Sequence, residues 1–220
     1  MTGLFVTFEG IEGCGKTTQL QKLSNHLKCQ NYQVVATREP GGTVIGDSIR
    51  TILLNPSHQE MSPLCELFLY EASRIQLLTE VIKPAMSQGA IDLCDRFTDS
   101  SLAYQGYGRG IPLELIKEQN RVATVGIRPQ LTFLFDLPVE EGFKRIAARQ
   151  YPTIRGCKED RLEREDLAFH ERVRKGFLDL AEKEPERIAV IDAREDEGQI
   201  FKAILSIIKD YVIQRDSRAR

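Results

Sequence analysis

Short apolar runs alternate along the chain with longer stretches in which apolar residues recur every three or four positions. A short apolar run predicts a strand buried on both faces of a parallel sheet, and the longer spacing predicts an amphipathic helix. The predicted strands cover residues 4–6, 33–37, 90–94, 131–135 and 188–191. The predicted helices cover residues 16–27, 45–53, 62–88, 112–124, 140–149, 164–184 and 200–208. This alternation favours an α/β fold, a doubly wound five-stranded parallel sheet with helices on both faces.

Two connecting segments follow neither pattern. Residues 97–111 are rich in Ser, Tyr and Gly and predict a loop. Residues 150–160 are polar and aperiodic and contain both Pro152 and Gly156, which is typical of an active-site lid or a surface loop. We assign a lid to about 149–160. Neither a repeat nor a linker divides the chain, so we expect one domain over residues 1–220.

The composition is that of an ordinary globular protein and narrows the function classes. Hydrophobic residues make up 41% and charged residues 28%, with a formal net charge of −2. No overall basic field therefore indicates a nucleic-acid partner. No apolar run approaches the roughly 18 residues of a membrane span, and the first strand begins without a secretory leader. We expect a cytoplasmic protein without a membrane partner.

The cysteines and histidines indicate neither a disulfide framework nor a metal site. Five cysteines are present without a C-x-x-C pair, and the odd count argues against a disulfide scaffold. His26, His58 and His170 lack the spacing of metal ligands, so we expect them to be surface or capping residues.

The strongest motif lies between the first predicted strand and helix. There, G-x-x-x-x-G-K-T describes a loop whose backbone N–H groups cradle phosphates at a helix N-terminus. Lys16 would reach the β- and γ-phosphates, and the Thr17 hydroxyl would ligate Mg²⁺. The competing interpretation is a glycine-rich turn that binds nothing. The expected nucleotide-binding residues are Gly10, Ile11, Glu12, Gly13, Cys14, Gly15, Lys16, Thr17 and Thr18.

A phosphate loop alone does not choose among GTPases, ATPases and kinases. The Asn-Lys-x-Asp motif of GTPases is absent from the sequence, and the chain is compact for a motor or helicase. Arg38, Arg50, Arg74 and Arg96 instead lie on segments that converge at one edge of the predicted sheet. Guanidinium groups suit bidentate binding of a second phosphate, while Lys16 holds the donor.

Four motifs resemble those of the bacterial thymidylate kinase family, and the resemblance covers residues 5–211. They are FEGIEGCGKTT (8–18), TREPGGT (37–43), YEASR (70–74) and DRFTDSSLAYQG (95–106). The resemblance implies a P-loop NTP hydrolase-like fold and the reaction ATP + dTMP ⇌ ADP + dTDP with Mg²⁺. The expected partners are therefore dTMP and ATP, and the family usually forms homodimers. Phe97 departs from the Tyr or His found in many members, which affects a secondary contact.

The resemblance also implies roles for individual residues around the acceptor. The nucleoside would contact Glu12 at the 3′-hydroxyl, Tyr104 beneath the deoxyribose, Tyr70 stacked on thymine, and Arg74, Gln105 and Ser101 at its polar edge. The acceptor phosphate would be gripped by Arg38 and Arg96 and enclosed by Arg50. Asp95 and Glu39 would organise Mg²⁺ and its waters together with Thr17.

The lid is expected to supply a catalytic arginine. Related enzymes carry an arginine after the acidic residue of the phosphate loop, whereas Gly13 follows Glu12 here. The resemblance implies that the lid compensates, with Arg155 as the first candidate and Arg149 as the second. Arg161 is expected to be structural, through Glu163 or Glu165. The catalytic set is therefore Lys16, Asp95, Arg96, Arg155 and Arg149.

Other interpretations remain open at this stage. Arg50, Arg74, Tyr70, Asp95, Glu12, Gln105 and Ser101 each have a structural alternative, such as a solvated helix position, a buried pair or a capped turn. Within enzymes, the alternative is a kinase for another monophosphate, such as dUMP or a purine nucleotide. From a different class, the alternative is a non-catalytic nucleotide-binding switch.

Overall fold

A five-stranded parallel sheet forms the centre of the protein. The structure is a computed structural model that describes residues 3–148 and 160–218. The strands are β1 (Leu4–Glu9), β2 (Val34–Arg38), β3 (Ile91–Asp95), β4 (Leu131–Asp136) and β5 (Ile188–Asp192). They lie in the order β2-β3-β1-β4-β5, and every neighbouring pair is parallel. The predicted strands and the α/β class are confirmed.

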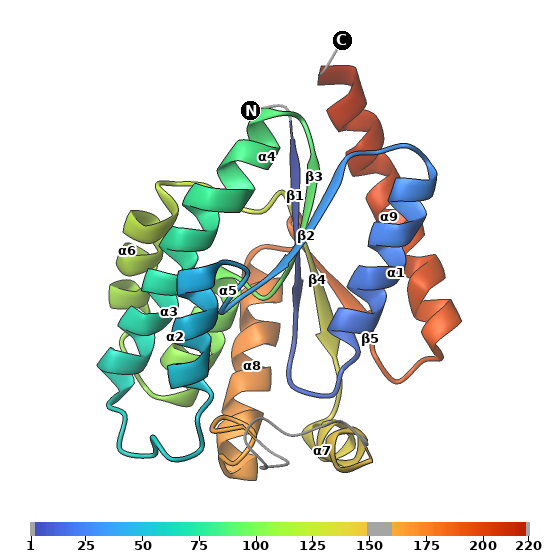
Figure 1. The fold of residues 1–220 in the computed structure, drawn as a ribbon. Coiled ribbons are helices and arrows are strands. Elements are labelled where there is room, and N and C mark those ends of the chain that lie inside the picture. The colour runs from blue at the N-terminus through green and yellow to red at the C-terminus, as the bar shows by residue number, and fades with distance from the viewer. Residues whose placement is uncertain (1–2, 149–159, 219–220) are drawn as a thin grey trace.

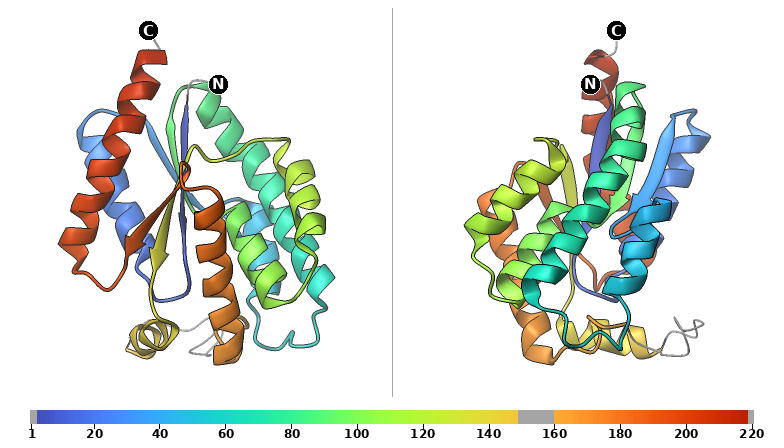
Figure 2. Two further views of the ribbon diagram at one scale, coloured as in Figure 1. Left: turned by 180° about the vertical axis from the view of Figure 1, so that it is seen from behind. Right: turned by 60° about the vertical axis from the view of Figure 1, so that its left-hand side comes forward.

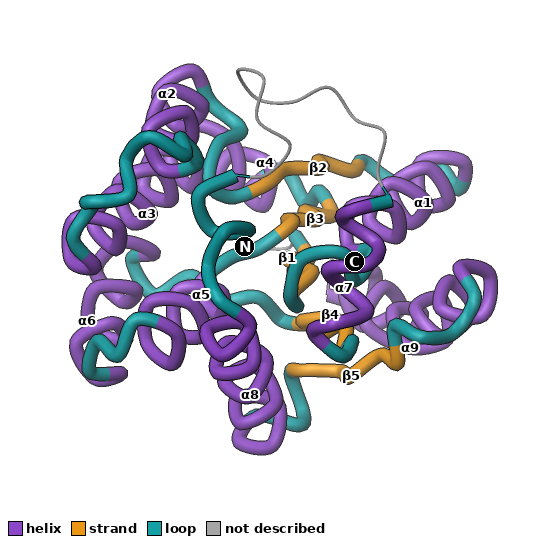
Figure 3. The backbone as a smooth tube through the Cα atoms, turned by 90° about the horizontal axis from the view of Figure 1, so that it is seen from below, coloured by secondary structure: helices purple, strands orange, loops and turns teal. Residues whose placement is uncertain are grey.

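Helices cover both faces of this sheet, as a doubly wound fold requires (Figure 1). Figure 3 shows α1 and α9 on one face and α2, α3, α5, α6 and α8 on the other. The longer helices are α1 (Lys16–Cys29), α2 (Val44–Leu53), α3 (Pro63–Leu77), α6 (Leu113–Thr124), α7 (Val139–Ala147), α8 (Leu167–Lys183) and α9 (Glu197–Arg218). The helix predicted over 62–88 continues from α3 through a π-helical stretch, η1 (Leu78–Ile82), into α4 (Lys83–Ser87). No helix among the described residues is long and apolar enough to cross a membrane.

The central strands are buried on both faces because helices pack on each side. Every residue of β1 is buried, and its apolar side chains divide between two apolar clusters. Val6 and Phe8 belong to the larger cluster, whereas Phe5 belongs to the smaller one and packs edge-on against Phe97. Phe8 pairs with Asp95 across β1 and β3, so the loops after these two strands meet at the same edge of the sheet (Figure 2).

The prediction of a loop over residues 97–111 is wrong. A short helix, α5 (Thr98–Ser101), runs into the π-helical segment η2 (Leu102–Gly108), which packs against α8. A Cβ at Gly108 would lie 2.6 Å from the Phe169 ring, and one at Gly106 would lie 2.5 Å from the Leu113 side chain. These glycines therefore serve close helix packing rather than a turn, a use that composition alone does not reveal.

Candidate active site

The phosphate loop closes tightly over the end of β1. Gly10, Gly13 and Gly15 have φ values of 135°, 78° and 92°, in the region that favours glycine. A Cβ at Gly10 would lie 2.5 Å from the Phe135 carbonyl oxygen, so a larger residue there is excluded by contact as well. Lys16 opens α1, and its Nζ donates to the carbonyl oxygens of Gly10 (3.0 Å) and Ile11 (2.8 Å).

The other loop residues divide between the cleft and the core. Glu12, Gly13, Gly15, Lys16, Thr17 and Thr18 line a large cleft above the sheet edge. The side chains of Ile11 and Cys14 are buried in the larger apolar cluster. Any contact that these two residues make to a phosphate is therefore through their backbone.

Thr17 and Asp95 form a pair of oxygen donors beside the phosphate loop. Thr17 Oγ1 donates to Asp95 Oδ2 over 2.5 Å, and both residues line the cleft. A hydroxyl and a carboxylate at this position fit a magnesium ion that takes its remaining ligands from phosphates and water. Within residues 3–148 and 160–218, no group of three or more His, Cys, Asp or Glu side chains could hold a metal.

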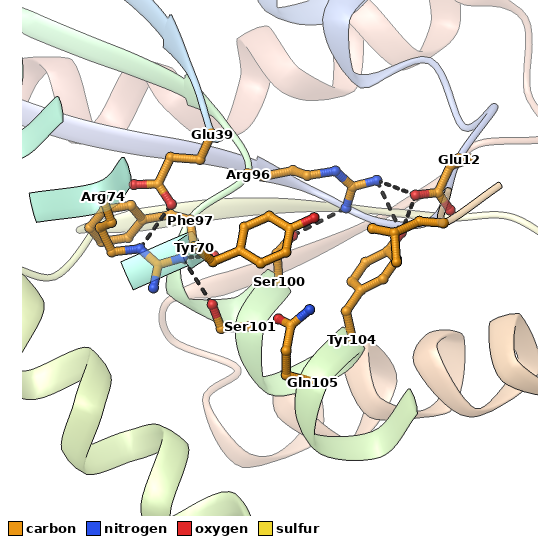
Figure 4. A pocket seen from close by; sticks show the side chains of 11 residues that line it. Glu12, Glu39, Tyr70, Arg74, Arg96, Phe97, Ser100, Ser101, Tyr104 and Gln105 are labelled. Carbon is orange, nitrogen blue, oxygen red and sulfur yellow. Dashed lines mark hydrogen bonds and ion pairs between the residues drawn. The ribbon is translucent and has the colours of Figure 1, made fainter. Parts of the chain in front are cut away.

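Arg96 lies between the phosphate loop and a second, smaller pocket. Its Nη1 donates to the Gly10 carbonyl oxygen (3.0 Å), and its Nη2 donates to Glu12 Oε1 (2.9 Å) and to the Tyr104 hydroxyl (3.0 Å). The Arg96 guanidinium also lies over the Tyr104 ring, 4.9 Å from its centroid. Arg96 therefore presents a fixed positive charge at the boundary of the two cavities (Figure 4).

Glu12 is ionised in this environment. Burial opposes its ionisation, but Arg96, the contact with His170 and Lys16 outweigh burial and lower the pKa of Glu12 well below its usual range. Its Oε1 also accepts a hydrogen bond from the Tyr104 hydroxyl over 2.6 Å. The carboxylate is thus available as an acceptor for a ligand hydroxyl.

The expectation that His170 is a surface or capping residue is wrong. Its side chain is 1% exposed, and Nδ1 lies 3.5 Å from Glu12 Oε2. Its Nε2 lies 3.1 Å from the Leu162 carbonyl oxygen. The apolar spacing of α8 was the available signal, because His170 lies beside Phe169 and three residues before Val173, both of which are buried.

The smaller pocket has the lining of a nucleoside site, because it combines aromatic side chains with a few polar groups. It brings together residues from the loops after β1, β2 and β3 and from α3, α5 and η2 (Figure 4). The predicted site residues that line it are Glu12, Glu39, Tyr70, Arg74, Arg96, Ser101, Tyr104 and Gln105. Phe97, Ser100 and Leu162 complete the wall.

Arg74 is held by a buried network within this pocket. Its Nε donates to Glu39 (2.8 Å), its Nη1 to Glu71 (2.6 Å) and Asn120 (2.8 Å), and its Nη2 to the Phe97 carbonyl and Ser101. All five guanidinium hydrogens therefore have protein partners. A hydrogen bond from Arg74 to a nucleobase would use a hydrogen that already has one of these partners. Glu39 pairs here with Arg74, and burial raises the pKa of Glu39 to about 8.

Arg38, the last residue of β2, and Arg50 of α2 both line the large cleft. Arg38 Nη2 lies 3.3 Å from Asp47, and Arg50 Nη1 donates to the Pro40 carbonyl oxygen (3.0 Å). Burial and the neighbouring Arg38 lower the pKa of Arg50. A buried arginine whose charge is disfavoured by a second arginine nearby indicates a site prepared for an anion.

The contacts of Arg161 agree with the structural role expected of it, and its buried ion pair is with Glu66. Arg161 is buried and pairs with Glu66 of α3, and its Nε donates to the Leu53 carbonyl oxygen (2.8 Å). Glu165 pairs with Arg109, which also binds Glu66. Glu66 in turn accepts a hydrogen bond from Gln105 Nε2 over 2.7 Å, so Gln105 Oε1 is the atom of this side chain that can accept a bond from a ligand.

The predicted lid, with Arg149 and Arg155, lies outside the described residues except for Asp160.

The phosphate loop shares a cleft with several arginines, and beside it lies a pocket lined by aromatic and polar side chains. These features together are those of a P-loop nucleotide kinase. A family model described as thymidylate kinase matches residues 8–204. Thymidylate kinase of Geotalea daltonii is 53% identical over 206 residues, which cover 94% of this chain and 96% of that protein. Thymidylate kinase of Geobacter sulfurreducens is 50% identical over 213 residues, with coverages of 97% and 100%.

A solved structure supports the same relationship. The crystal structure of thymidylate kinase from Ehrlichia chaffeensis matches with a TM-score of 0.74 at 35% identity. The match covers 94% of this chain and 98% of that chain. The chain belongs to the thymidylate kinase family.

Proposed function

We propose that the protein transfers the γ-phosphoryl group of ATP to dTMP, which yields ADP and dTDP and supplies dTTP synthesis. The observation that carries this proposal is the place of Arg96. One guanidinium binds the phosphate loop through Gly10 and the nucleoside pocket through Glu12 and Tyr104. A donor bound at the loop and an acceptor bound in the pocket would therefore meet at this charge.

The donor side uses the phosphate loop. The loop N–H groups and Lys16 would bind the ATP phosphates, with Lys16 leaving its contacts with Gly10 and Ile11. Thr17 and Asp95 would hold Mg²⁺, and Glu39 would act on its water ligands through Oε1, which has no hydrogen-bond partner among the described residues. When bound, Mg²⁺ neutralises charge on the phosphate oxygens.

The acceptor side uses the smaller pocket. Tyr70 would stack on thymine, and Arg74, Ser101 and Gln105 would contact its polar edge. Glu12 would accept the 3′-hydroxyl, and Tyr104 would lie beneath the deoxyribose. Arg96, Arg38 and Arg50 would bind the acceptor phosphate.

Catalysis then depends on position and charge. Phosphoryl transfer asks the protein to align donor and acceptor and to neutralise negative charge, so no nucleophilic side chain is required. Arg155 and Arg149 remain the predicted sources of an additional positive charge from the lid.

We also propose that the protein forms a homodimer through α3 and α6. Leu64, Phe68 and Ile75 of α3 are 48%, 52% and 46% exposed, and their spacing places them on one helix face. Leu115 and Val122 of the neighbouring α6 are also exposed. An exposed apolar surface of this kind favours an isologous interface. Sedimentation of the parent and of Phe68→Glu would test it, and a monomeric parent would contradict it.

Because nucleoside monophosphates are cytoplasmic metabolites, the proposed reaction belongs to the cytoplasm.

A panel of acceptors at fixed Mg·ATP tests the activity. The panel contains dTMP, dUMP, dCMP, dGMP and ribothymidine monophosphate, and product and ADP are both measured. We expect the highest kcat/KM with dTMP and equal amounts of dTDP and ADP. A higher kcat/KM with another acceptor would identify that acceptor, and not dTMP, as the substrate. Nucleotide binding without acceptor-dependent ADP release would indicate a switch rather than a kinase.

A further inference from the structure

Arg96 has a backbone conformation that only a few non-glycine residues adopt. Its φ is 72°, in the left-handed region, directly after β3. Its amide still donates to the Phe8 carbonyl oxygen (3.0 Å), so the chain leaves the sheet at this residue. A strained residue of this kind persists where surrounding contacts hold it in place, and such residues cluster at functional sites.

Glu9 supplies the contacts that hold this turn. It is the last residue of β1, and its side chain is 0% exposed. Its Oε1 accepts from the Phe97 amide (2.7 Å), which directly follows Arg96. Its Oε2 accepts from the Ser100 hydroxyl (2.6 Å) in α5. One buried carboxylate therefore binds both the residue after Arg96 and the first turn of the helix that follows.

Ser100 extends this contact to the guanidinium. Arg96 Nη1 donates to Ser100 Oγ (3.1 Å), and the same hydroxyl donates a hydrogen bond to Glu9. Figure 4 shows Ser100 beside the Arg96 guanidinium, on the side toward α5. Glu9 thus restrains the backbone of Arg96 through the Phe97 amide that follows it. It restrains the Arg96 side chain through the Ser100 hydroxyl.

We infer that Glu9 is a positioning residue, which sets the backbone and, through Ser100, the guanidinium of Arg96 for binding the acceptor phosphate. This inference rests on the proposed function, because it takes Arg96 as a phosphate contact. Glu9 is fully buried beneath the phosphate loop, so its effect passes through Arg96 rather than through a contact with substrate.

Glu9→Gln separates the two contacts while keeping the size of the side chain. The amide oxygen can still accept from Phe97, but the amide nitrogen then faces Ser100 Oγ as a donor. The hydroxyl loses the carboxylate that accepted its hydrogen and polarised it, so its bond to Arg96 weakens. Ser100→Ala removes the same link from the other end and leaves the Phe97 contact. Asp92→Asn is the matched control, because Asp92 is an equally buried carboxylate in the adjacent strand, outside both cavities.

The experiment compares dTMP with thymidine, which lacks the phosphate. Dissociation constants for dTMP come from calorimetry, and inhibition constants for thymidine come from competition. We expect Glu9→Gln and Ser100→Ala each to weaken dTMP binding about 10- to 100-fold, the scale of a hydrogen bond to a charged group. Thymidine inhibition should change by less than about twofold, because nucleoside contacts remain. Asp92→Asn should leave both constants unchanged.

A double-mutant cycle adds an independent measurement. In an Arg96→Ala background, Glu9→Gln should cause no further loss of dTMP binding, because the residue it positions is gone. The inference is overturned if both variants bind dTMP as the parent does, if dTMP and thymidine weaken equally, or if the effects of Glu9→Gln and Arg96→Ala add. Should Glu9→Gln fail to fold, Ser100→Ala decides. If the parent itself fails to convert dTMP, the proposed function fails instead.

Discussion

His170 Nδ1 lies 3.5 Å from Glu12 Oε2, so a side chain of α8 contacts the phosphate loop. The ring is clamped from its other side, where Nε2 meets the Leu162 carbonyl oxygen and the Phe143 ring packs edge-on. Leu162 lines the nucleoside pocket together with Glu12. His170 therefore connects two walls of that pocket without lining it.

His170→Phe should keep the packing and lose the contact with Glu12. Because Glu12 is proposed to bind the 3′-hydroxyl, we expect KM for dTMP to rise about three- to tenfold, on the scale of one lost hydrogen bond, with little change in kcat. Steady-state kinetics with 3′-deoxythymidine monophosphate provides the control. The variant and the parent should have the same KM for that analogue, and a rise for both acceptors would assign His170 a purely structural role.

Replacing Tyr104 should alter the choice between deoxyribose and ribose. The ring is 3% exposed and packs near Phe169 and Phe177, so it cannot move aside for a 2′-hydroxyl. Tyr104→Ala should raise the relative kcat/KM for ribothymidine monophosphate and weaken dTMP binding. Tyr104→Phe keeps the ring and loses only the hydroxyl, which bonds Glu12 and Arg96, so it should leave the selectivity ratio unchanged. An unchanged ratio in Tyr104→Ala would remove the steric explanation.

Lys16→Ala should abolish turnover without unfolding the protein. Its ammonium would oppose phosphate charge during transfer, and loss of such a preorganised group costs about 10²-fold or more in kcat. Lys22→Ala, a surface residue of the same helix paired with Glu197, is the control. Circular dichroism checks the fold, and near-parental kcat in Lys16→Ala would reject this loop as the donor site.

The predicted lid arginines are tested side by side. Arg155→Ala should lower the rate of single-turnover transfer strongly, because arginine fingers contribute about 10³-fold or more, while dTMP binding changes little. A large loss only in Arg149→Ala would move the role to that residue. Parental rates in both single variants and in the double variant would exclude a lid arginine.

Asp92 predicts an unusual dependence of stability on pH. Neither of its carboxylate oxygens has a hydrogen-bond partner among the described residues, and burial raises its pKa from 3.8 to about 7. Between these values the folded protein holds a proton that the unfolded chain has released. The contribution of Asp92 to the free energy of unfolding is therefore fully present below pH 3.8, falls as pH rises and is lost above about 7.

Asp92→Asn isolates this contribution, because Glu9 and Glu39 have raised pKa values as well. The free energy of unfolding of the variant relative to the parent should increase from acidic to neutral pH. The increase is about 4 kcal/mol at most, since one pKa unit corresponds to about 1.4 kcal/mol. Urea unfolding at pH 5 and pH 8 measures it, and the same difference at both pH values would contradict the expectation.

The features that depend on local sequence could be predicted. Within residues 8–18, Gly10, Gly13 and Gly15 permit the positive φ values that the phosphate loop requires. The apolar runs indicate where the strands lie, regardless of which helices pack on them. The alternation of strand and helix then leaves few topologies, because parallel strands need covered faces. The family motifs further indicated a common site for residues from distant segments, and the structure places Tyr70, Arg74, Arg96 and Gln105 around one pocket.

The features that depend on partners far along the chain were decided only by the tertiary structure. The helix over 98–108 forms because Gly106 and Gly108 admit neighbouring side chains, which a Gly-rich composition equally allows in a loop. His170 lies in no motif, and the motif that contains Glu9 assigns it no role. The importance of these two residues lies in what they contact, Glu12 and the turn at Arg96. A polar residue acquires such a role when burial removes water and leaves a single partner to satisfy it, and that partner is known only once the helices have packed on the sheet.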